Sequence, residues 1–591
     1  MVKDKQTKLP GAWLRFRGAM DYYARFIEEN QLLLEEDWHL FVNQFRSGVD
    51  DADAGWRGEY FGKMMRGACM TYRYTQNEAL YELLTKIAEE MLTTQDDQGR
   101  FSSYSPEKEF IGWDMWSRKY VLLGYLHYLD ICRDEALKAR ILAALERHLD
   151  YVVAHIGPDK KPLEQTSHKW KCINSASILE PTLLMYNRTG KESYLAFAQY
   201  IIDFLMTGEA NIFALALENK LDPYQYPVTK AYEMMSCFEG LLEYYRLTGE
   251  EKWLRAAVQF ADRVHNSDIT VIGCAGCRSE QFDNSARTQT NEEYQGIMQE
   301  TCVTVTWMKL CDQLLRLTGD PKYGDWIEVS LYNALFGAVN TDKCQTNNGF
   351  PFDSYSPLYL QQRGRKSGGF KLISDTRYYG CCVAIGAAGL ALPLLTAAME
   401  TDDGLAVNYY EEGTLVGKGL TLEIRTGYPA GNLVQLRILE AEAQACCLAL
   451  RIPAYGKNST LTLNGQPVTV TPGYTTLCRT WQAGDELVLS LDMAPRVVKP
   501  LGMEGKPETL DFLAVQYGPL TLARDGRLSE VGTPVAKSDW AAVKVLDKGE
   551  FPCILRADVT LGDQTYPMVN YSAAGKTWDK DSLTECWLKC K

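Results

Sequence analysis

The sequence predicts a mainly α-helical barrel of paired helices, followed by a region of all-β sandwich structure. The main observation is a repeated helical unit, in which an amphipathic stretch ends at a Thr-Gly pair and a second stretch begins at once. Copies lie around Gly190, Gly249 and Gly319, which are 59 and 70 residues apart, enough for two helices and a loop. Glycine suits the left-handed position after a helix, and acidic residues suit the first turn of the next helix. We therefore expect five or six helix hairpins in series, closed into a toroid.

An open solenoid of helical repeats is the alternative to this closed barrel. The segments 266–297 and 340–378 are much longer than typical connections between helices, and loops of that length usually carry function. These two segments favour the barrel.

Near residue 400 the pattern changes to short alternating runs separated by Gly, Pro and Asn turns, such as TLVGKGLTLEIRT, LVQLRILEA and DELVLSLDM. This pattern is typical of an antiparallel sandwich. We expect the barrel to span 1–398, a β-sandwich 399–510, and a smaller β-rich module 511–591 that completes or flanks the sandwich.

Composition excludes several classes of protein. The 591 residues carry a formal net charge of -14, which argues against a general binder of nucleic acid or of an anionic membrane surface. No stretch is apolar for long enough to span a bilayer, and the first residues lack the pattern of a secretory signal. Without such a signal, the 17 cysteines are expected to be thiols or metal ligands, and the protein to be cytoplasmic.

Two pairs of residues predict a metal site. Cys381 and Cys382 precede the apolar run VAIGAAGLALPLLTAAM, so they belong to the first turn of a helix or the loop before it, where a thiolate is favoured. Upstream, Glu300 and Cys302 lie two residues apart, and an extended or turning backbone at a helix start lets them converge. Three thiolates and a carboxylate suit zinc, which prefers tetrahedral sulfur and nitrogen ligands and accepts a carboxylate.

Two other cysteine pairs serve as comparisons. Cys446 and Cys447 are also adjacent, but the alternating pattern around them points one thiol into the sandwich and the other out, which indicates a structural role. Cys274 and Cys277 form a CxxC without a second CxxC at zinc-ribbon spacing, which is weak support for a metal site. Adjacency alone therefore does not identify the zinc ligands.

Several segments, in this order, resemble the β-L-arabinofuranosidases of glycoside hydrolase family 127 over nearly the whole chain. They are TQDDQGRFSSY at 94–104, ILEPTLLMYNRTG at 178–190, SEQF at 279–282, ETC at 300–302, YGDWIEVSLYNAL at 323–335, GCC at 380–382 and QYGPL at 516–520. The resemblance implies an (α/α)6 barrel of paired helices followed by β-sandwich modules.

The resemblance also implies a mechanism. Zinc would be held by Glu300, Cys302, Cys381 and Cys382, with Cys381 as the nucleophile and Glu280 of SEQF as the acid/base. Such an exo-acting, retaining glycosidase would remove a terminal L-arabinofuranose-like sugar from a small plant-derived oligosaccharide. Because the loop from Glu280 to Glu300 is longer than the family's usual spacing, weaker candidates for the acid/base are Glu292 and Glu293.

The sugar pocket departs from the family pattern. Three histidines that contact sugar hydroxyls in the family align here with Arg118, Ser175 and Lys230. Two fixed cations in a sugar pocket lead to the hypothesis of a carboxylated substrate, because a guanidinium binds a carboxylate bidentately. The alternative is that the two cations pair with nearby carboxylates of the chain, namely Asp114, Glu180 or Glu233.

Further substrate-binding candidates lie in loops or near helix starts: His168, Trp113 and Tyr355. Two other functions stay open, an uronate-processing hydrolase, lyase or epimerase that leaves the thiols structural, and a non-catalytic carbohydrate-binding protein with a structural zinc. A homodimer formed through the β region also stays open.

Overall fold

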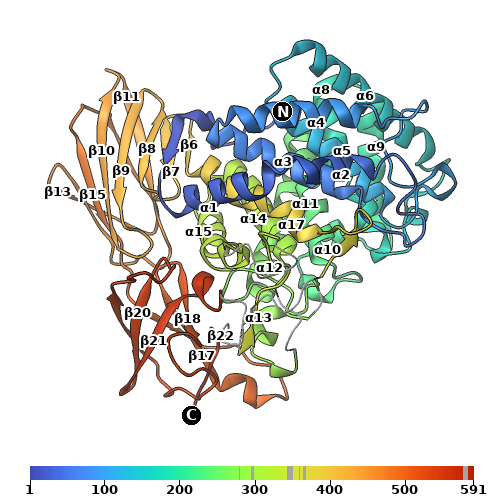
Figure 1. Ribbon diagram of the computed structural model, residues 1–591. Helices are drawn as coiled ribbons and strands as arrows, with labels where there is room; N and C mark the ends of the chain where they lie inside the picture. The colour runs from blue at the N-terminus through green and yellow to red at the C-terminus, as the bar shows by residue number, and fades with distance from the viewer. Residues whose placement is uncertain (279, 295–298, 342–349, 359, 364–367, 577–582) are drawn as a thin grey trace. The chain divides into compact units, whose positions relative to one another are not determined.

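The computed structural model of the protein describes residues 1–591 apart from 279, 295–298, 342–349, 359, 364–367 and 577–582 (Figure 1). The chain forms two compact units. The first comprises Met1–Lys3, Ile27–Ser267 and Gly368–Ala388, and the second comprises Asp4–Phe26, Asp268–Ser367 and Gly389–Lys591.

The first unit is built from paired helices. Helices α3, α5 and α11 are buried on nearly every side, whereas α4, α9 and α12 bury one face only, as expected for an inner and an outer layer. Their bounds are α2 (Glu35–Asn43), α3 (Glu59–Thr75), α4 (Glu78–Leu92), α5 (Asp114–Leu129), α6 (Glu135–His155), α7 (Ile173–Ala176), α8 (Leu179–Thr189), α9 (Glu192–Thr207), α10 (Ile212–Glu218), α11 (Ala231–Thr248) and α12 (Glu251–Ser267).

The predicted helix-ending glycines are confirmed. Gly190 follows α8 and Gly249 follows α11, each at a φ of 68°, and each donates its N–H to the carbonyl four residues earlier at 2.8 Å. Gly319 ends α14 in the same way in the second unit. This is the left-handed helix cap that only glycine adopts without strain.

Two inner helices of the first unit touch through glycine. A Cβ on Gly62 of α3 would lie 1.8 Å from the carbonyl oxygen of Tyr120 of α5, and a Cβ on Gly124 would lie 2.8 Å from the Cα of Gly62. No larger residue fits at Gly62 without separating the helices. This close approach holds the side chains of α3 and α5 in fixed relation.

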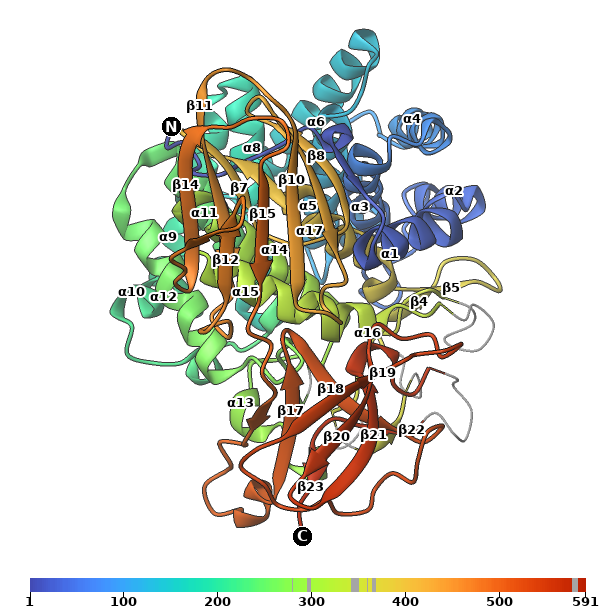
Figure 2. The ribbon, with the colours of Figure 1, turned by 90° about the vertical axis from the view of Figure 1, so that its left-hand side faces the viewer.

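The second unit combines further helices with β-sheets (Figures 1 and 2). Its helices are α1 (Ala19–Ile27), α13 (Ser285–Thr288), α14 (Thr301–Thr318), α15 (Lys322–Val329) and α16 (Phe336–Ala338), and α17 (Cys381–Thr396) belongs half to each unit. One sheet has the strand order β1-β6-β7-β11-β14 and another the order β13-β12-β15-β10-β9-β8-β2. Their bounds are β1 (Thr7–Lys8), β2 (Leu14–Phe16), β6 (Ala398–Glu400), β7 (Gly404–Val407), β8 (Gly413–Gly417), β9 (Leu420–Thr426), β10 (Leu433–Ala441), β11 (Ala445–Ile452), β12 (Thr460–Leu463), β13 (Gln466–Val468), β14 (Gly473–Thr480) and β15 (Glu486–Ser490).

A third sheet has the order β16-β17-β18-β21-β20-β19, with β22, β23 and β3 attached to it. Its strands are β16 (Arg496–Val498), β17 (Phe512–Tyr517), β18 (Leu520–Asp525), β19 (Ala542–Leu546), β20 (Arg556–Leu561), β21 (Gln564–Asn570), β22 (Leu583–Glu585), β23 (Leu588–Lys589) and β3 (Gln361–Gln362). The predicted fold class, a helical first part followed by a β-rich part, is confirmed.

The first strands of the chain pair with strands far along the sequence. Thr7 of β1 lies opposite Glu400 of β6, and Leu14 of β2 lies opposite Leu415 of β8. Because β-pairing at such separation leaves no local pattern, the sequence assigned this segment to the barrel. The three predicted domain boundaries stay predictions.

The second cysteine pair differs from expectation in one respect. Cys446 is buried and Cys447 faces the other side of β11, as the alternation predicted. Cys447 lies opposite Cys478 of β14, however, and the two form a disulfide, whereas the sequence favoured thiols and metal ligands. Directly opposed residues of an antiparallel pair bring their Cβ atoms close, which only the strand register reveals.

Among the described residues, no single helix has both the length and the apolar character that a membrane crossing requires, although the bent pair α9 and α10 passes the same criteria together.

Candidate active site

Cys381 is the first residue of α17 and is held by a neighbouring turn of the first unit. Its N–H donates to the carbonyl oxygen of Gly369 at 3.1 Å, and the indole of Trp56 donates to the same oxygen at 3.3 Å. Before it, β5 (Tyr378–Gly380) pairs with β4 (Phe370–Leu372). Gly369 has a φ of 70°, and a Cβ there would lie 2.3 Å from the Cys381 sulfur. The partly exposed thiol therefore lies at a helix N-terminus, which favours the thiolate.

Glu300 and Cys302 lie at the start of α14 in the second unit. Glu300 has extended backbone geometry at the N-cap and Cys302 lies in the first turn, as predicted. Both are buried. The segment 353–356 holds this helix start, since the Thr301 N–H donates to the Ser354 carbonyl oxygen at 2.9 Å.

The structure brings the four predicted ligands together. The ligand atoms of Glu300, Cys302, Cys381 and Cys382 all lie within 4.8 Å of one another. The sulfurs of Cys381 and Cys382 are 3.9 Å apart, close to the ~3.8 Å that a tetrahedral centre with ~2.3 Å zinc–sulfur bonds requires. Three soft sulfur donors and one carboxylate oxygen, mostly buried, fit a zinc ion.

Glu280 is positioned by Tyr355, whose hydroxyl donates to one of its carboxylate oxygens. The backbone of Tyr355 in turn forms a β-bridge with Glu300. The half-buried Glu280 has a φ of 59°, an uncommon left-handed conformation for a non-glycine residue. Backbone strain of this kind clusters at functional sites. Within the second unit, the candidate acid/base and one candidate zinc ligand are thus tied to the same short segment.

The weaker acid/base candidates form ion pairs instead. Glu292 lies 2.8 Å from the ammonium of Lys589, and Glu293 pairs with Lys506. Both glutamates are well exposed, so they serve as surface ion pairs of the second unit and not as a proton donor held in a pocket.

The CxxC pair packs behind the same helix start. The Cys274 thiol lies 3.4 Å from the carbonyl oxygen of Glu300, and the Gln299 amide lies 3.4 Å from the Cys277 sulfur. Burial raises the pKa of Cys274 to about 12, so the thiol stays neutral at ordinary pH. These cysteines support the backbone of a ligand and do not join the cluster.

Glu59, at the start of α3, is a site residue that the sequence did not single out. Its carboxylate lies 2.9 Å from the ammonium of Lys63 and accepts a hydrogen bond from the indole of Trp116. Burial raises the pKa of Glu59 to about 7, Lys63 opposes this shift, and the nearby Cys381 sulfur adds to it. The only sequence signal was a Glu and a Lys one turn apart, which most exposed helices also carry.

Arg118 does not support the hypothesis of a carboxylated substrate. Its guanidinium lies 3.0 Å from the Asp114 carboxylate and 2.7 Å from that of Glu109. The guanidinium carbon of Arg118 lies 4.6 Å from the ring centre of Phe110 and 5.6 Å from that of Tyr151, which belongs to α6. Arg118 is therefore held between an inner and an outer helix, the alternative that the sequence left open.

The other predicted pocket residues lie on several elements of the first unit. Trp113 packs edge to face on Trp56 at 6.1 Å, so it belongs to the same aromatic group that holds the turn at Cys381. Lys230 is the N-cap of α11 and lies 5.5 Å from the Trp170 ring. Ser175 is buried in α7, and His168 is exposed, and their role in substrate binding stays a prediction.

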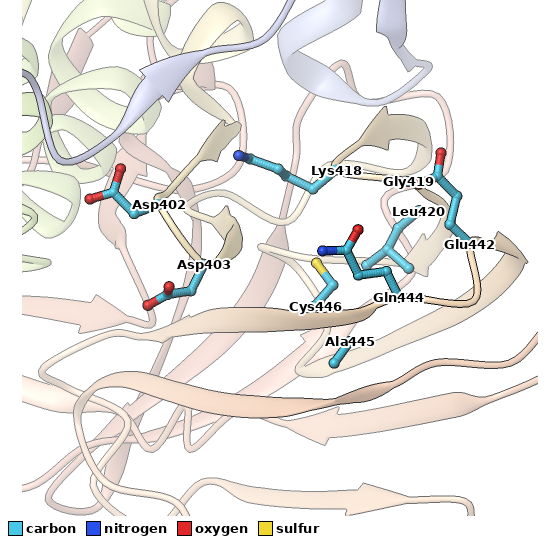
Figure 3. A pocket seen from close by; sticks show the side chains of 9 residues that line it. All are labelled: Asp402, Asp403, Lys418, Gly419, Leu420, Glu442, Gln444, Ala445 and Cys446. Carbon is cyan, nitrogen blue, oxygen red and sulfur yellow. The ribbon is translucent and has the colours of Figure 1, made fainter.

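A separate hollow of about 300 Å³ lies on the sandwich (Figure 3). It is lined by Asp402, Asp403, Lys418, Gly419, Leu420, Glu442, Gln444, Ala445 and Cys446. None of these residues is aromatic, so the hollow lacks the flat rings on which a sugar stacks.

Comparison with known families identifies the family of the chain. The family model described as Beta-L-arabinofuranosidase, GH127 catalytic domain, matches residues 8–391, and the GH127 middle domain matches residues 404–493. The chain belongs to glycoside hydrolase family 127. The resemblance that the sequence motifs indicated is confirmed.

Relatives are distant in sequence and close in fold. A non-reducing end β-L-arabinofuranosidase of Bifidobacterium longum is 25% identical over 352 residues, which cover 53% of this chain and 52% of that protein, about half its length. A solved GH127 β-arabinofuranosidase superposes with a TM-score of 0.78 at 18% identity, covering 100% of this chain and 98% of the other. The β-L-arabinofuranosidase of Geobacillus stearothermophilus T6 gives 0.75 at 16% identity, with coverages of 98% and 100%. At such identities the structures show the shared fold.

Proposed function

We propose that the protein is an exo-acting, retaining glycosidase that removes a terminal L-arabinofuranose-like sugar from plant-derived oligosaccharides. The observation that carries the proposal is the cluster of Glu300, Cys302, Cys381 and Cys382 in a chain of this family. A zinc ion in this cluster would hold the Cys381 thiol in its deprotonated, nucleophilic form.

In the first half of the proposed reaction, the Cys381 sulfur attacks the anomeric carbon. A carbon–sulfur bond forms while the bond from that carbon to the leaving oxygen breaks, and Glu280 gives its proton to this oxygen. The Tyr355 hydroxyl orients the carboxyl group of Glu280 for the transfer.

In the second half, Glu280 accepts a proton from a water molecule, whose oxygen attacks the anomeric carbon. The carbon–sulfur bond breaks and the sulfur leaves as a thiolate. Two displacements at one carbon give overall retention of configuration.

A neutral sugar is the proposed substrate. The cation that most directly suggested a carboxylated one, Arg118, already binds two carboxylates of the chain. Assays of aryl β-L-arabinofuranosides beside carboxylated glycosides test this point, and efficient cleavage of the carboxylated set alone would overturn it.

The nucleophile and the acid/base are tested separately. Cys381→Ser should abolish turnover of every glycoside, with Cys446→Ser as the matched control in the other adjacent pair. Glu280→Gln should retain the first step only for a substrate with a very good leaving group, such as a dinitrophenyl glycoside, which needs no proton donor. Zinc is measured by elemental analysis of freshly reduced protein, and activity that survives both substitutions would exclude this mechanism.

The other two functions give distinct results. An unsaturated product formed from an uronate would indicate a lyase, and carbohydrate binding without cleavage in the wild-type protein would indicate a binding protein with a structural metal. The cytoplasmic location and the homodimer stay predictions.

A further inference from the structure

A stripe of polar side chains runs down α3 from the site. Glu59, Lys63 and Arg66 are spaced by four and three residues, so they lie on one face of the helix. Each is at most 2% exposed. Trp116 and Tyr120 of α5 lie against this face, since the Lys63 ammonium is 5.8 Å and 5.2 Å from their ring centres.

A second stripe, on α11, meets the first. Tyr232, Ser236 and Glu239 follow the same spacing of four and three residues and are all buried. The hydroxyls of Tyr120 and Tyr232 share a hydrogen bond, and the Lys63 ammonium lies 4.8 Å from the Tyr232 ring centre. The interior of the first unit is therefore polar over two turns of helix.

Arg66 is the unusual member of this interior. It is 1% exposed, and no described residue accepts a hydrogen bond from any of its three guanidinium nitrogens. The ring centre of Tyr120 lies 5.6 Å from its guanidinium carbon. Arg118, just as buried, has two carboxylate partners by contrast. A buried cation without acceptors is strongly unfavourable, which indicates that Arg66 serves a bound ligand.

Charge decides which class of ligand suits Arg66. Burial works against its charge, but two tyrosines and the carboxylates of Glu180 and Glu239 raise its pKa, so it is a cation. Lys63 is already neutralised by Glu59. A carboxylated ligand would add a third negative charge beside Glu180 and Glu239 in a poorly screened interior. A neutral hydroxyl can accept a hydrogen bond from Arg66 without that cost.

The position of Arg66 along α3 indicates which group of the bound sugar it would contact. Glu59 acts electrostatically on the Cys381 sulfur, where the anomeric carbon would react. Arg66 lies seven residues further along α3, a rise of ~10 Å. The group that extends furthest from the anomeric carbon of an arabinofuranose is its exocyclic hydroxymethyl.

We propose that Arg66 is a specificity-determining residue that donates a hydrogen bond to the 5-hydroxyl of the sugar bound at Cys381. This inference rests on the proposed function and names the recognition of a neutral furanose within it. Glu180, whose Oε2 has no hydrogen-bond partner among the described residues, interacts electrostatically with Arg66 and would accept a hydrogen bond from the same hydroxyl group.

The test compares an aryl β-L-arabinofuranoside with its 5-deoxy analogue on wild type, Arg66→Met and Arg66→Lys. For the wild type, kcat/KM should fall ~10- to 100-fold when the 5-hydroxyl is removed, the range for a hydrogen bond to a charged group. In Arg66→Met the ratio of kcat/KM between the parent substrate and its 5-deoxy analogue should approach one. Only the parent substrate has the 5-hydroxyl that loses its hydrogen-bond donor in this variant. Arg66→Lys should restore part of the ratio.

Arg118→Met is the matched control, an equally buried arginine on the neighbouring inner helix. It should lower the melting temperature, because it strands two carboxylates, and should keep the wild-type ratio between the two substrates. Arg118→Lys serves if that variant does not fold. Arg66→Met should lower the melting temperature less than Arg118→Met, since no described side chain is hydrogen-bonded to Arg66.

An unchanged ratio in both Arg66 variants, with turnover still dependent on Cys381, would overturn the inference and leave the proposed function standing. A wild-type protein that cleaves neither substrate would instead overturn the proposed function. The two failures are therefore distinguishable.

Discussion

Replacing Gly369 by alanine should disable the site at only a modest cost in stability. The new Cβ would lie 2.3 Å from the Cys381 sulfur, whereas carbon atoms in ordinary contact lie ~3.5–4.0 Å from their neighbours. The sulfur must therefore move by about 1 Å or more. A displacement of that size in a reacting group costs ~100-fold in rate.

The chain offers a matched control for the backbone part of this change. Gly369 and Gly190 have nearly the same φ, 70° and 68°, so alanine at either position meets the same left-handed penalty of roughly 1–2 kcal/mol. A Cβ on Gly190, however, meets nothing within 4 Å. Any difference between the two variants reports the contact with Cys381.

The assay measures kcat/KM on an aryl arabinofuranoside, bound zinc and the melting temperature of both variants. Both should melt slightly lower than the wild type, and only Gly369→Ala should lose activity and weaken zinc retention. If Gly369→Ala has the same kcat/KM and the same zinc content as Gly190→Ala, the Cys381 sulfur does not lie against this turn.

Three further predictions concern the second unit. Tyr355→Phe should lower kcat ~10- to 100-fold with zinc content unchanged, because Glu280 loses the donor that orients it; a normal kcat would refute this role. Arg451→Met should destabilise the protein by about 3–5 kcal/mol in denaturant melts, because buried Glu328 loses the cation 2.8 Å away and keeps only the hydroxyl of Tyr428; an unchanged unfolding free energy would contradict this. Burial raises the pKa of Glu411 from 4.5 to about 8, so the folded state holds a proton that the unfolded chain loses. Stability should therefore fall as pH rises from 4.5 to 8, by on the order of 5 kcal/mol at most, and Glu411→Gln should flatten this dependence in melting curves.

Much of the fold was readable from local pattern. The glycines that end α8, α11 and α14 were predicted because a left-handed residue is required after a helix and glycine adopts it at no cost. The four residues of the candidate metal cluster were also predicted, since cysteines before an apolar helix and an acidic residue before another are local features. The short N-terminal strands were not, because their partners lie hundreds of residues away.

The substrate pocket was only partly predictable. Sequence alignment pointed to Arg118 as the cation that selects the sugar, but two carboxylates within a few residues of it, Asp114 and Glu109, already bind it. Arg66 gave no signal, because a lone arginine in an amphipathic helix is usually a surface residue. Glu59 was missed for the same reason.

The sequence by itself determined the helical hairpins, the β-rich second part, the family, and the four residues whose ligand atoms the structure gathers into a candidate metal cluster. These depend on residue type and on spacing along the chain, which fix backbone conformation and donor chemistry locally. Only the tertiary structure decided that the Tyr355 hydroxyl meets Glu280, that Cys447 meets Cys478, and that no described residue accepts a hydrogen bond from Arg66. The reason is physical: whether a charge or a thiol has a partner depends on distances of a few ångströms between residues far apart in sequence, and no local pattern records them.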